Sequence, residues 1–469
     1  MKLKIDPLAM KIVETLTTAG YEAYVVGGAV RDVLLSRATS DWDVTTNATP
    51  EQILPLFTES FYDNNYGTVM VAAKHLKQQF AMGEETKDDD VYDITTYRSE
   101  HGYSDKRRPD KVTWGTKIEE DLKRRDFTVN AIALSIPVIQ YSGTPVAEYE
   151  VELIDPYDGQ SDIKNGVIRA VGKAEERFEE DALRIMRAVR IAAQLGFIIE
   201  PATLAAIAKK APNLKAISAE RIGAEFIKIM ESENAADGVM LMASCKILEV
   251  IIPELISTKE VKQGGHHIYD VFTHSVEALR ACPSPDPVVR LATLLHDVDK
   301  AVVAKKGGER GVTFYNHEVS GARTAKRIAE RLKLSKKDQD RVFTLVRWHM
   351  FTYDSKMTDA AIRRFIRRVG KENIHDMMAL RVGDRVGGGS KATSWRLTEL
   401  QKRIGEQFYE PLSLKDLAID GNDVMRILGL PQGKQVGEIL NKLFEEVIED
   451  SHKNTKEYLE ERVKELGTS

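Results

Sequence analysis

Tyr24-Val-Val-Gly-Gly-Ala-Val-Arg31-Asp32, followed after a short loop by Asp41-Trp-Asp43, is the stretch of sequence that decides the fold. A hydrophobic segment runs into two glycines, an arginine follows at the start of a helical pattern, and two acids one residue apart come on the next strand-like segment. Because side chains alternate faces along a strand, we expect Asp41 and Asp43 to point the same way and to share two magnesium ions about 3.5–4 Å apart.

The glycines and the arginine suit a phosphate group. Gly27 and Gly28 have no Cβ, so the backbone can approach phosphate oxygens closely, and the N-terminus of the helix that carries Arg31 adds N–H donors and partial positive charge. The alternative is a surface turn with two solvated acids. Because glycines, arginine and paired acids occur in the order that the chemistry needs, the stretch favours a site for nucleoside triphosphates.

Composition places few limits on partners. The chain has 469 residues, 42% hydrophobic content and a formal charge of −5, and its length indicates about three domains of about 150 residues. Two cysteines, Cys245 and Cys282, are too few for a disulfide framework or a cysteine-based zinc site. No stretch approaches about 18 uninterrupted apolar residues. We therefore expect a cytoplasmic protein with no membrane partner, and the oligomeric state stays open.

The pattern of apolar residues changes along the chain. A short amphipathic helix is predicted over 8–16, and strands over 23–26, 41–45, 67–73 and 91–97. From about residue 165 the spacing becomes helical, as over 178–195, 218–232, 318–333 and 436–449. Glycine and proline predict breaks within Gly383–Ser390 and near Pro411. The sequence thus predicts an α+β fold: a small α/β head with a mixed sheet, followed by a long all-α body.

A second motif lies within residues 119–134. Asp126 and Asn130 are four residues apart, so on a helix they would share a face and meet a ribose or each other. The fork of the Arg125 guanidinium matches phosphate oxygens. A charged helix start with a structural acid and amide is the alternative. Ahead of this motif lies a polar, basic loop that includes Arg98 and could reach over a nucleotide. Asp93, on the predicted strand just before that loop, is a candidate third metal carboxylate.

A third motif, Glu180-Asp-Ala-Leu-Arg-Ile-Met-Arg-Ala-Val-Arg190, places Asp181, Arg184, Arg187 and Arg190 at intervals of three, along one stripe of a predicted helix. A carboxylate accepts from an exocyclic amine and a guanidinium donates to a ring nitrogen. Asp181 with Arg184 would therefore admit cytosine and adenine and reject uracil and guanine, with about 1–3 kcal/mol of discrimination. The alternative is a helix with an ion pair between these two residues.

The three motifs in this order resemble the class II tRNA nucleotidyltransferase and bacterial poly(A) polymerase family. The resemblance implies addition of C, C and A from CTP and ATP to the tRNA 3′ end without a template, with release of pyrophosphate. It also implies Mg²⁺ on the paired aspartates and an element around Arg221 that braces the pocket. The residues it assigns are the catalytic and metal-binding Asp41 and Asp43, and the nucleotide-binding Gly28, Arg31, Arg125, Asp181 and Arg184, with Arg187 and Arg190 extending the stripe.

Several activities compete within that family. Poly(A) polymerases share the head, but the tail here has mixed charge and no strongly basic extension. CC-only enzymes are expected to lack a functional loop of the kind that Arg98, Tyr103 and Arg108 form here, which favours full CCA addition and leaves an A-adding specialist open. A tRNA-binding module without activity is a further alternative, which the intact acid pair disfavours.

Six of the ten histidines fall between residues 266 and 349. His274, His296-Asp297 and Asp384 form a pattern that resembles the HD phosphohydrolase superfamily, with His317 and His349 also in the segment, and imidazole and carboxylate are ligands of transition metals. Asp299 stands where that superfamily commonly has glycine, so we expect an extra carboxylate beside the metal. The pattern favours a phosphohydrolase or phosphodiesterase that uses Ni, Co or Mn. The alternative is a purely structural helical body.

The resemblances together predict four parts. These are a nucleotidyltransferase head (1–145), a helical neck for base selection and RNA contact (146–255), an HD-type helical domain (256–390) and a helical tail for tRNA contact (391–469).

Overall fold

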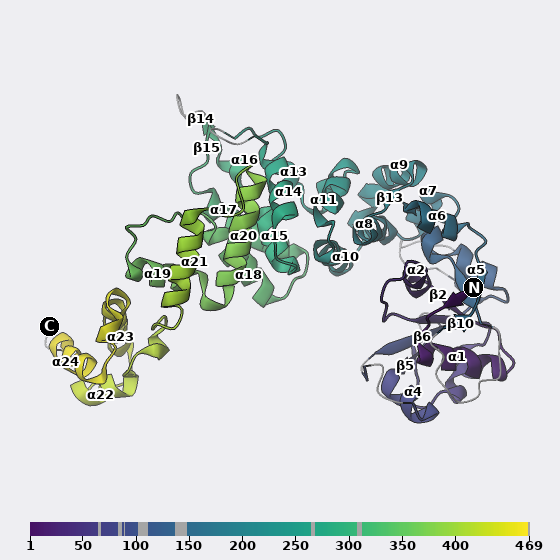
Figure 1. The fold of residues 1–469 in the computed structure, drawn as a ribbon, viewed down its shortest axis with the longest axis horizontal. Helices are drawn as coiled ribbons and strands as arrows, with labels where there is room; N and C mark the ends of the chain where they lie inside the picture. Colours follow the sequence, from purple (N-terminus) through teal and green to yellow (C-terminus); the bar gives the residue numbers. More distant parts are fainter. Residues whose placement is uncertain are drawn as a thin grey trace. The chain divides into compact units, whose positions relative to one another are not determined.

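The computed structural model describes residues 1–63, 67–82, 87–88, 90–101, 111–136, 148–263, 268–306 and 312–467 (Figure 1). The chain divides into two compact units, Met1–Ile251 and Ile252–Ser469. This boundary lies close to the one expected between residues 255 and 256, and the finer division into four parts stays a prediction. No helix in the described part of the chain has the length and apolar character needed to cross a membrane.

A mixed seven-stranded sheet organises the first unit, with the order β11-β9-β2-β3-β6-β5-β4. Among the described pairs, β3 and β6 run parallel and the other neighbours run antiparallel. The strands are β2 (Ala23–Val26), β3 (Asp43–Thr46), β4 (Phe61–Asp63), β5 (Thr68–Ala72), β6 (Val91–Thr96), β9 (Ala133–Ser135) and β11 (Glu152–Ile154). The predicted α+β class with a mixed sheet is confirmed. We expected both acids to lie on one strand. However, β3 begins at Asp43, so Asp41 precedes the strand.

Helices of the first unit follow the predicted apolar spacing. Asp6 caps the first helix by accepting from the backbone N–H groups of Leu8 and Ala9, and Ile12 and Leu16 are buried with Leu8. The helices are α1 (Pro7–Thr18), α2 (Gly28–Leu34), α3 (Pro50–Ile53), α4 (Ala73–Phe80), α5 (Ile118–Lys123), α6 (Gly159–Asn165), α7 (Ala174–Glu180), α8 (Leu183–Leu195), α9 (Pro201–Lys210), α10 (Ala219–Glu231), α11 (Ala235–Ser244) and α12 (Ile247–Ile251).

Two helices expected from the motifs differ in the structure. The helix predicted over 178–195 is interrupted, because Asp181 has extended backbone angles (φ −137°, ψ 106°) and its carboxylate accepts from the N–H of Leu183 at the start of α8. Asp181 is therefore not part of the helical stripe. Asp126 follows α5 and Asn130 lies in a short 3₁₀ turn, so these two residues do not share an α-helical face either.

In its described residues the second unit is mainly helical, with one antiparallel pair of two-residue strands, β14 (Lys305–Lys306) and β15 (Val312–Thr313). Its helices are α13 (Pro253–Ile256), α14 (Val271–Ala281), α15 (Pro287–Leu295), α16 (Lys300–Val303), α17 (His317–Arg331), α18 (Lys336–Trp348), α19 (Asp359–Val369), α20 (Ile374–Gly387), α21 (Trp395–Gln407), α22 (Gly421–Leu428), α23 (Lys434–Glu449) and α24 (Lys456–Gly467). The last three share a core that includes Val424, Leu443 and Leu459.

The break predicted within Gly383–Ser390 is wrong in part, because α20 continues to Gly387. Glycine serves helix packing here. A Cβ on Gly383 would lie 2.6 Å from the carbonyl oxygen of Ala278, and a Cβ on Gly387 would lie 2.4 Å from the backbone nitrogen of Ala278. The two glycines thus let α20 approach α14 closely, and this contact brings Asp384 towards the histidine of α14.

Candidate active site and metal centre

A cleft of about 670 Å³ in the first unit collects the predicted nucleotide-site residues. All nine line it, although they come from three separate motifs. They are Gly28, Arg31, Asp41, Asp43, Arg125, Asp181, Arg184, Arg187 and Arg190. Arg98 lines the same cleft, whereas Tyr103 and Arg108 lie outside the described residues.

Gly27 forms the tightest corner of this cleft. Its φ is +83°, in the left-handed region, and a Cβ there would lie 2.8 Å from Asp43 Oδ2 and 3.1 Å from Arg125 Nη1. Gly28 is less constrained, since a Cβ would first meet Arg31 at 3.5 Å. The first glycine is therefore the one that only glycine can occupy, because any side chain would displace an acid and an arginine together.

The paired acids differ in environment. Asp41 is exposed, whereas Asp43 is half-buried, and burial raises the pKa of Asp43 to about 6, with Arg125 opposing the rise and Asp41 and Asp93 adding to it. Asp93 faces Asp43 across the parallel β3–β6 pair, and burial raises the pKa of Asp93 as well. Three carboxylates that repel one another beside a cleft fit a site for a divalent cation, which would relieve the repulsion.

Asp126 and Asn130 meet each other and connect the first and third motifs. Asn130 Nδ2 donates to Asp126 Oδ1 (3.1 Å), and Arg31 Nη1 donates to Asn130 Oδ1 (2.8 Å). On the other side, Arg187 Nε donates to Asp126 Oδ2 (2.7 Å). Although burial acts to raise it, Arg187 and Asn130 hold the pKa of Asp126 well below its usual range. The network fixes the relative positions of α2 and α8 on the two sides of the cleft.

The base-reading candidates are not paired with each other, which excludes the simple ion-pair alternative. Asp181 Oδ2 accepts from Arg221 Nη2 (3.1 Å), which supports the expected bracing role of Arg221. Arg184 donates to Glu180 Oε2 (2.6 Å) and to the carbonyl oxygen of Arg124 (3.0 Å). Each carboxylate oxygen has two lone pairs and Arg184 has five N–H groups, so both side chains retain capacity to meet a base edge.

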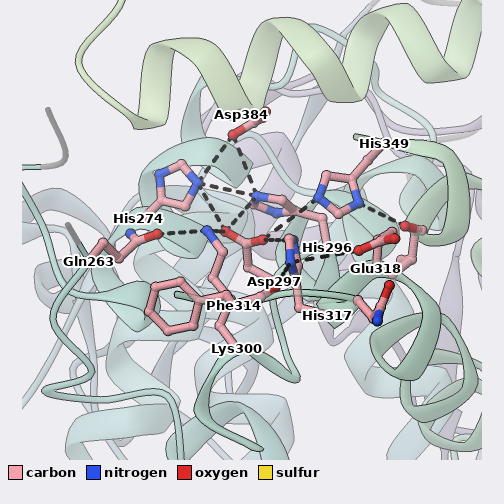
Figure 2. Close-up of polar contacts among 12 residues, drawn as sticks. Gln263, His274, His296, Asp297, Lys300, Phe314, His317, Glu318, His349 and Asp384 are labelled. Atoms are coloured by element: carbon pink, nitrogen blue, oxygen red, sulfur yellow. Dashed lines mark hydrogen bonds and ion pairs between the residues drawn. The ribbon is translucent and has the colours of Figure 1, made fainter. Parts of the chain in front are cut away.

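The predicted metal ligands of the second unit also converge (Figure 2). His274 comes from α14, Asp384 from α20, and His296-Asp297 directly follows α15. Asp297 Oδ2 lies 3.5 Å from His274 Nε2 and 3.2 Å from His296 Nε2, and Asp384 Oδ1 lies 3.3 Å and 3.6 Å from the same two nitrogens. The ligand atoms of His274, His296 and Asp297 thus form one group that could hold a metal ion, with Asp384 close to both imidazoles. Imidazole and carboxylate are ligands that divalent transition metals favour.

A second donor group lies on the other oxygen of Asp297. Asp297 Oδ1 is 3.2 Å from His317 Nε2 and 3.7 Å from His349 Nε2, and these ligand atoms form a group of their own. The sequence placed both histidines in the segment but did not assign them as ligands. The Nε2 atoms of both histidines have no hydrogen-bond partner among the described residues, although they are buried. Such a nitrogen beside a carboxylate fits a metal ligand.

Backbone carbonyls fix the tautomers of three of these histidines. The Nδ1 atoms of His296, His317 and His349 each lie 2.7 Å from a carbonyl oxygen, those of Thr293, Phe314 and Val346 respectively. A carbonyl can only accept, so Nδ1 must carry the proton in each case. In the neutral ring Nε2 then presents its lone pair, which is the arrangement that a metal-binding histidine needs.

The charges of this centre are strongly shifted. Burial alone lowers the pKa of His296, but Asp297 and Asp384 raise it to about 10, whereas burial and the charge of His296 lower the pKa of His349 to about 3. Lys300 Nζ also lies 2.6 Å from Asp297 Oδ2 and donates to Gln263. The same nitrogen of His296 can bind either a proton or a metal ion. Metal binding would therefore release the proton.

Asp299 does not contribute the extra metal carboxylate that we expected. Its Oδ2 accepts from Thr324 Oγ1 (3.2 Å) on α17, and Asp299 belongs to neither donor group. Its φ of −94° is ordinary for any residue, so glycine is not required at this position.

Three family models match the chain. The Poly A polymerase head domain matches residues 23–169, the RNA and SrmB-binding site of polymerase A matches 196–258, and tRNA nucleotidyltransferase domain 2 matches 313–463. A CCA-adding enzyme of Ligilactobacillus salivarius is 32% identical over 479 residues, which covers 98% of this chain and 96% of that protein. The chain belongs to the CCA-adding enzyme family.

Other CCA-adding enzymes match the chain over a shorter range. The relative from Lactobacillus helveticus is 41% identical over 268 residues, which covers 56% of this chain and 60% of that protein. The relative from Leuconostoc citreum is 43% identical, with 54% of that protein covered. These matches thus span little more than half the length of either relative.

Solved structures of CCA-adding enzymes match the chain over both of its units. The Bacillus stearothermophilus CCA-adding enzyme in complex with CTP has a TM-score of 0.69 and 27% identity, with 98% of each chain covered. The Thermotoga maritima CCA-adding enzyme complexed with tRNA has a TM-score of 0.55 and 19% identity, and shows the shared fold alone.

Proposed function

We propose that this chain adds C, C and A from CTP and ATP to the 3′ end of tRNA, in the cytoplasm, and releases pyrophosphate. The observation that carries the proposal is that the acid pair, the Gly27 corner and the base-reading residues line one cleft. Membership in the CCA-adding enzyme family supports it, and so does the likeness to an enzyme solved with CTP.

The residues divide the work of the reaction. Mg²⁺ held by Asp41 and Asp43 would activate the RNA 3′ hydroxyl and stabilise the leaving pyrophosphate. The N-terminus of α2 at Gly28, with Arg31 and Arg125, would bind the triphosphate. The new bond joins the 3′ oxygen to the α-phosphorus as the bond to the β-phosphate oxygen breaks.

Base selection would come from the end of the cleft formed around α8. Asp181 would accept from the exocyclic amine of cytosine or adenine, and Arg184 would donate to the ring nitrogen beside it. Uracil and guanine present a carbonyl beside an N–H, so each would leave a donor facing a donor and an acceptor facing an acceptor. Arg187 and Arg190, which pair with Asp126 and Glu225, would hold this part of the cleft in shape.

Radiolabelled CTP and ATP, supplied separately and together, test the proposal on tRNA that ends before C, after C and after CC. We expect extension to CCA and no further. Addition of A alone, of CC alone or of a long A tract would identify the alternative specialists, and incorporation by Asp43→Ala at the wild-type rate would refute the metal assignment.

A second activity is favoured by the centre in the second unit. We propose that His274, His296, Asp297 and Asp384 would hold one divalent ion there, and that Asp297, His317 and His349 would hold a second. Such ions would activate water for hydrolysis of a phosphoester. Phosphate release from 2′,3′-cyclic nucleotides with added Ni²⁺, Co²⁺ or Mn²⁺ tests this activity. Absence of release, or equal release from His296→Ala, would refute it.

A further inference from the structure

A buried acid beside the nucleotide cleft has no role in the scheme above. Asp121 lies in α5 with its side chain fully buried. Its Oδ1 accepts from Arg124 Nε (2.9 Å) and Nη2 (2.6 Å), and its Oδ2 accepts from Arg125 Nη2 (3.3 Å). A buried carboxylate is stable only when cations and hydrogen bonds compensate it, and here both cations line the cleft.

Asp121 is anchored to the sheet that carries the Gly27 corner. On either side of it in α5, Ile118 and Leu122 are buried in a cluster with Val26 at the end of β2 and with Tyr97. The next residue after Val26 is Gly27. The helix that carries the Asp121 carboxylate therefore packs against the strand that leads into the phosphate-binding corner.

Arg125 connects this anchor to the reacting end of the cleft. While Nη2 bonds to Asp121, Nη1 lies 3.1 Å from the place of a Cβ on Gly27, and that place is 2.8 Å from Asp43 Oδ2. Arg125 Nε is buried without a hydrogen-bond partner among the described residues. Nη1 also makes a long hydrogen bond to the carbonyl oxygen of Asn130 (3.5 Å). The guanidinium is therefore held through Nη2 and Nη1, with Nη1 beside the corner where phosphate oxygens would bind.

Asp121 is ionised in the folded protein. Burial acts to raise its pKa, but the guanidiniums of Arg124 and Arg125 lower the pKa below its ordinary value. A charge-assisted contact of this kind restricts a side chain that would otherwise sample many rotamers.

We propose that Asp121 is a positioning residue for triphosphate binding, which presets Arg125 and Arg124 for the phosphate oxygens that CTP and ATP share. The inference rests on the proposed function and gives a role to a residue of the second motif to which the sequence assigned none. Among the described residues, Asp121 makes no hydrogen bond or ion pair with Asp181 or Arg184, and Arg184 contacts Arg124 through the backbone carbonyl of Arg124, not through the side chain that Asp121 holds. Loss of Asp121 should therefore weaken binding of both nucleotides equally and leave the choice between cytosine and uracil unchanged.

Calorimetric binding of CTP, ATP and CMP to the full chain with Mg²⁺, without RNA, tests the proposal. For Asp121→Asn we expect CTP and ATP to bind about tenfold more weakly and CMP to be unaffected, since CMP lacks the β- and γ-phosphates. In assays with tRNA, KM for both nucleotides should rise by a similar factor while the CTP-to-UTP preference stays constant.

Asp162→Asn is the matched control, because Asp162 is also a buried acid of the first unit paired with an arginine, Arg169, but does not line the cleft. Wild-type binding by Asp121→Asn, an equal loss for CMP, or a loss for one nucleotide alone would overturn the proposal. If wild-type protein binds neither CTP nor ATP, the proposed function itself fails.

Should Asp121→Asn not fold, Arg125→Lys replaces it. Lysine keeps the charge but lacks the fork that reaches Asp121 and a phosphate together. We expect the same loss for CTP and ATP, and wild-type binding by this variant would overturn the proposal.

Discussion

At the scale of single residues, Asp43 shows how position changes the chemistry of a common side chain. The sequence predicted that it pairs with Asp41, and both line the cleft. The acids nevertheless differ, because Asp43 begins the β3 strand inside the unit whereas Asp41 lies before the strand and is exposed. This difference makes the acid pair sensitive to pH.

The first prediction concerns stability of the protein without metal. Burial raises the pKa of Asp43 from 3.8 to about 6, so the folded state holds this proton more tightly than the unfolded chain and loses stability as pH rises from about 4 to about 6. In EDTA at pH 8, Asp43→Asn should raise the free energy of unfolding of the first unit by about 1–3 kcal/mol. Urea unfolding measures this gain, which should vanish at pH 4; an equal gain at both pH values would contradict the explanation.

The second prediction concerns the base. Arg184→Ala removes the donor proposed for the ring nitrogen, so the preference for CTP over UTP should fall by about 5- to 150-fold, the equivalent of about 1–3 kcal/mol. The ratio of kcat/KM for the two nucleotides measures the preference. The control is Lys173→Ala, which removes an exposed ion pair with Glu176 at the start of α7. This variant should keep the preference for CTP over UTP. An unchanged ratio in Arg184→Ala would mean that another group reads the base.

The motif residues could be predicted because each motif is local, and its spacing carries its chemistry. The partners that hold them could not. Asp121 looks like one acid among several in a charged helix start, and His317 and His349 look like isolated histidines until α17 and α18 bring them to Asp297. Such partners are set by tertiary packing, which a periodic pattern does not report.

At the scale of elements, the points at which helices end or continue were the least predictable feature. Periodicity over 178–195 continues through Asp181, because Phe178 of α7 is buried like the apolar face of α8, although the backbone turns between the two helices. Conversely, Gly383 and Gly387 resemble part of a linker but lie in α20, where they allow close packing. Local composition cannot distinguish a glycine that ends a helix from one that faces another helix.

The third prediction follows from that packing. Gly387→Ala places a Cβ about where the backbone of Ala278 lies, so it should destabilise the second unit by about 1–3 kcal/mol and weaken metal binding by separating His274 from Asp384. Thermal unfolding and Ni²⁺ titration measure the two effects. Gly405→Ala in α21, where a Cβ meets nothing within 4 Å, is the control and should be neutral or slightly stabilising. Equal behaviour of the two variants would contradict the packing argument.

At the scale of the whole molecule, the chain carries two chemically different centres in two compact units. The cleft of the first unit lies between a sheet and helices and is rich in arginine, whereas the centre of the second is a buried cluster of histidine and carboxylate. The described residues of each centre come from one unit, so each unit should respond to its own ligand.

The fourth prediction is that ligands protect the two units separately. A ligand at 100 times its Kd adds about 2.7 kcal/mol to the stability of the unit that binds it. Hydrogen exchange should slow within Met1–Ile251 when CTP and Mg²⁺ are added, and within Ile252–Ser469 when Ni²⁺ is added. Asp43→Ala should abolish the first effect only, and His296→Ala the second only. Protection of both units by CTP would show that the units are coupled.

The Gly27 corner has a practical consequence. A methyl group at this one position would intrude on a carboxylate and a guanidinium at once. Gly27→Ala should therefore weaken nucleotide capture and turnover together, and it would supply a stalled enzyme in which an unextended RNA end can be trapped and viewed.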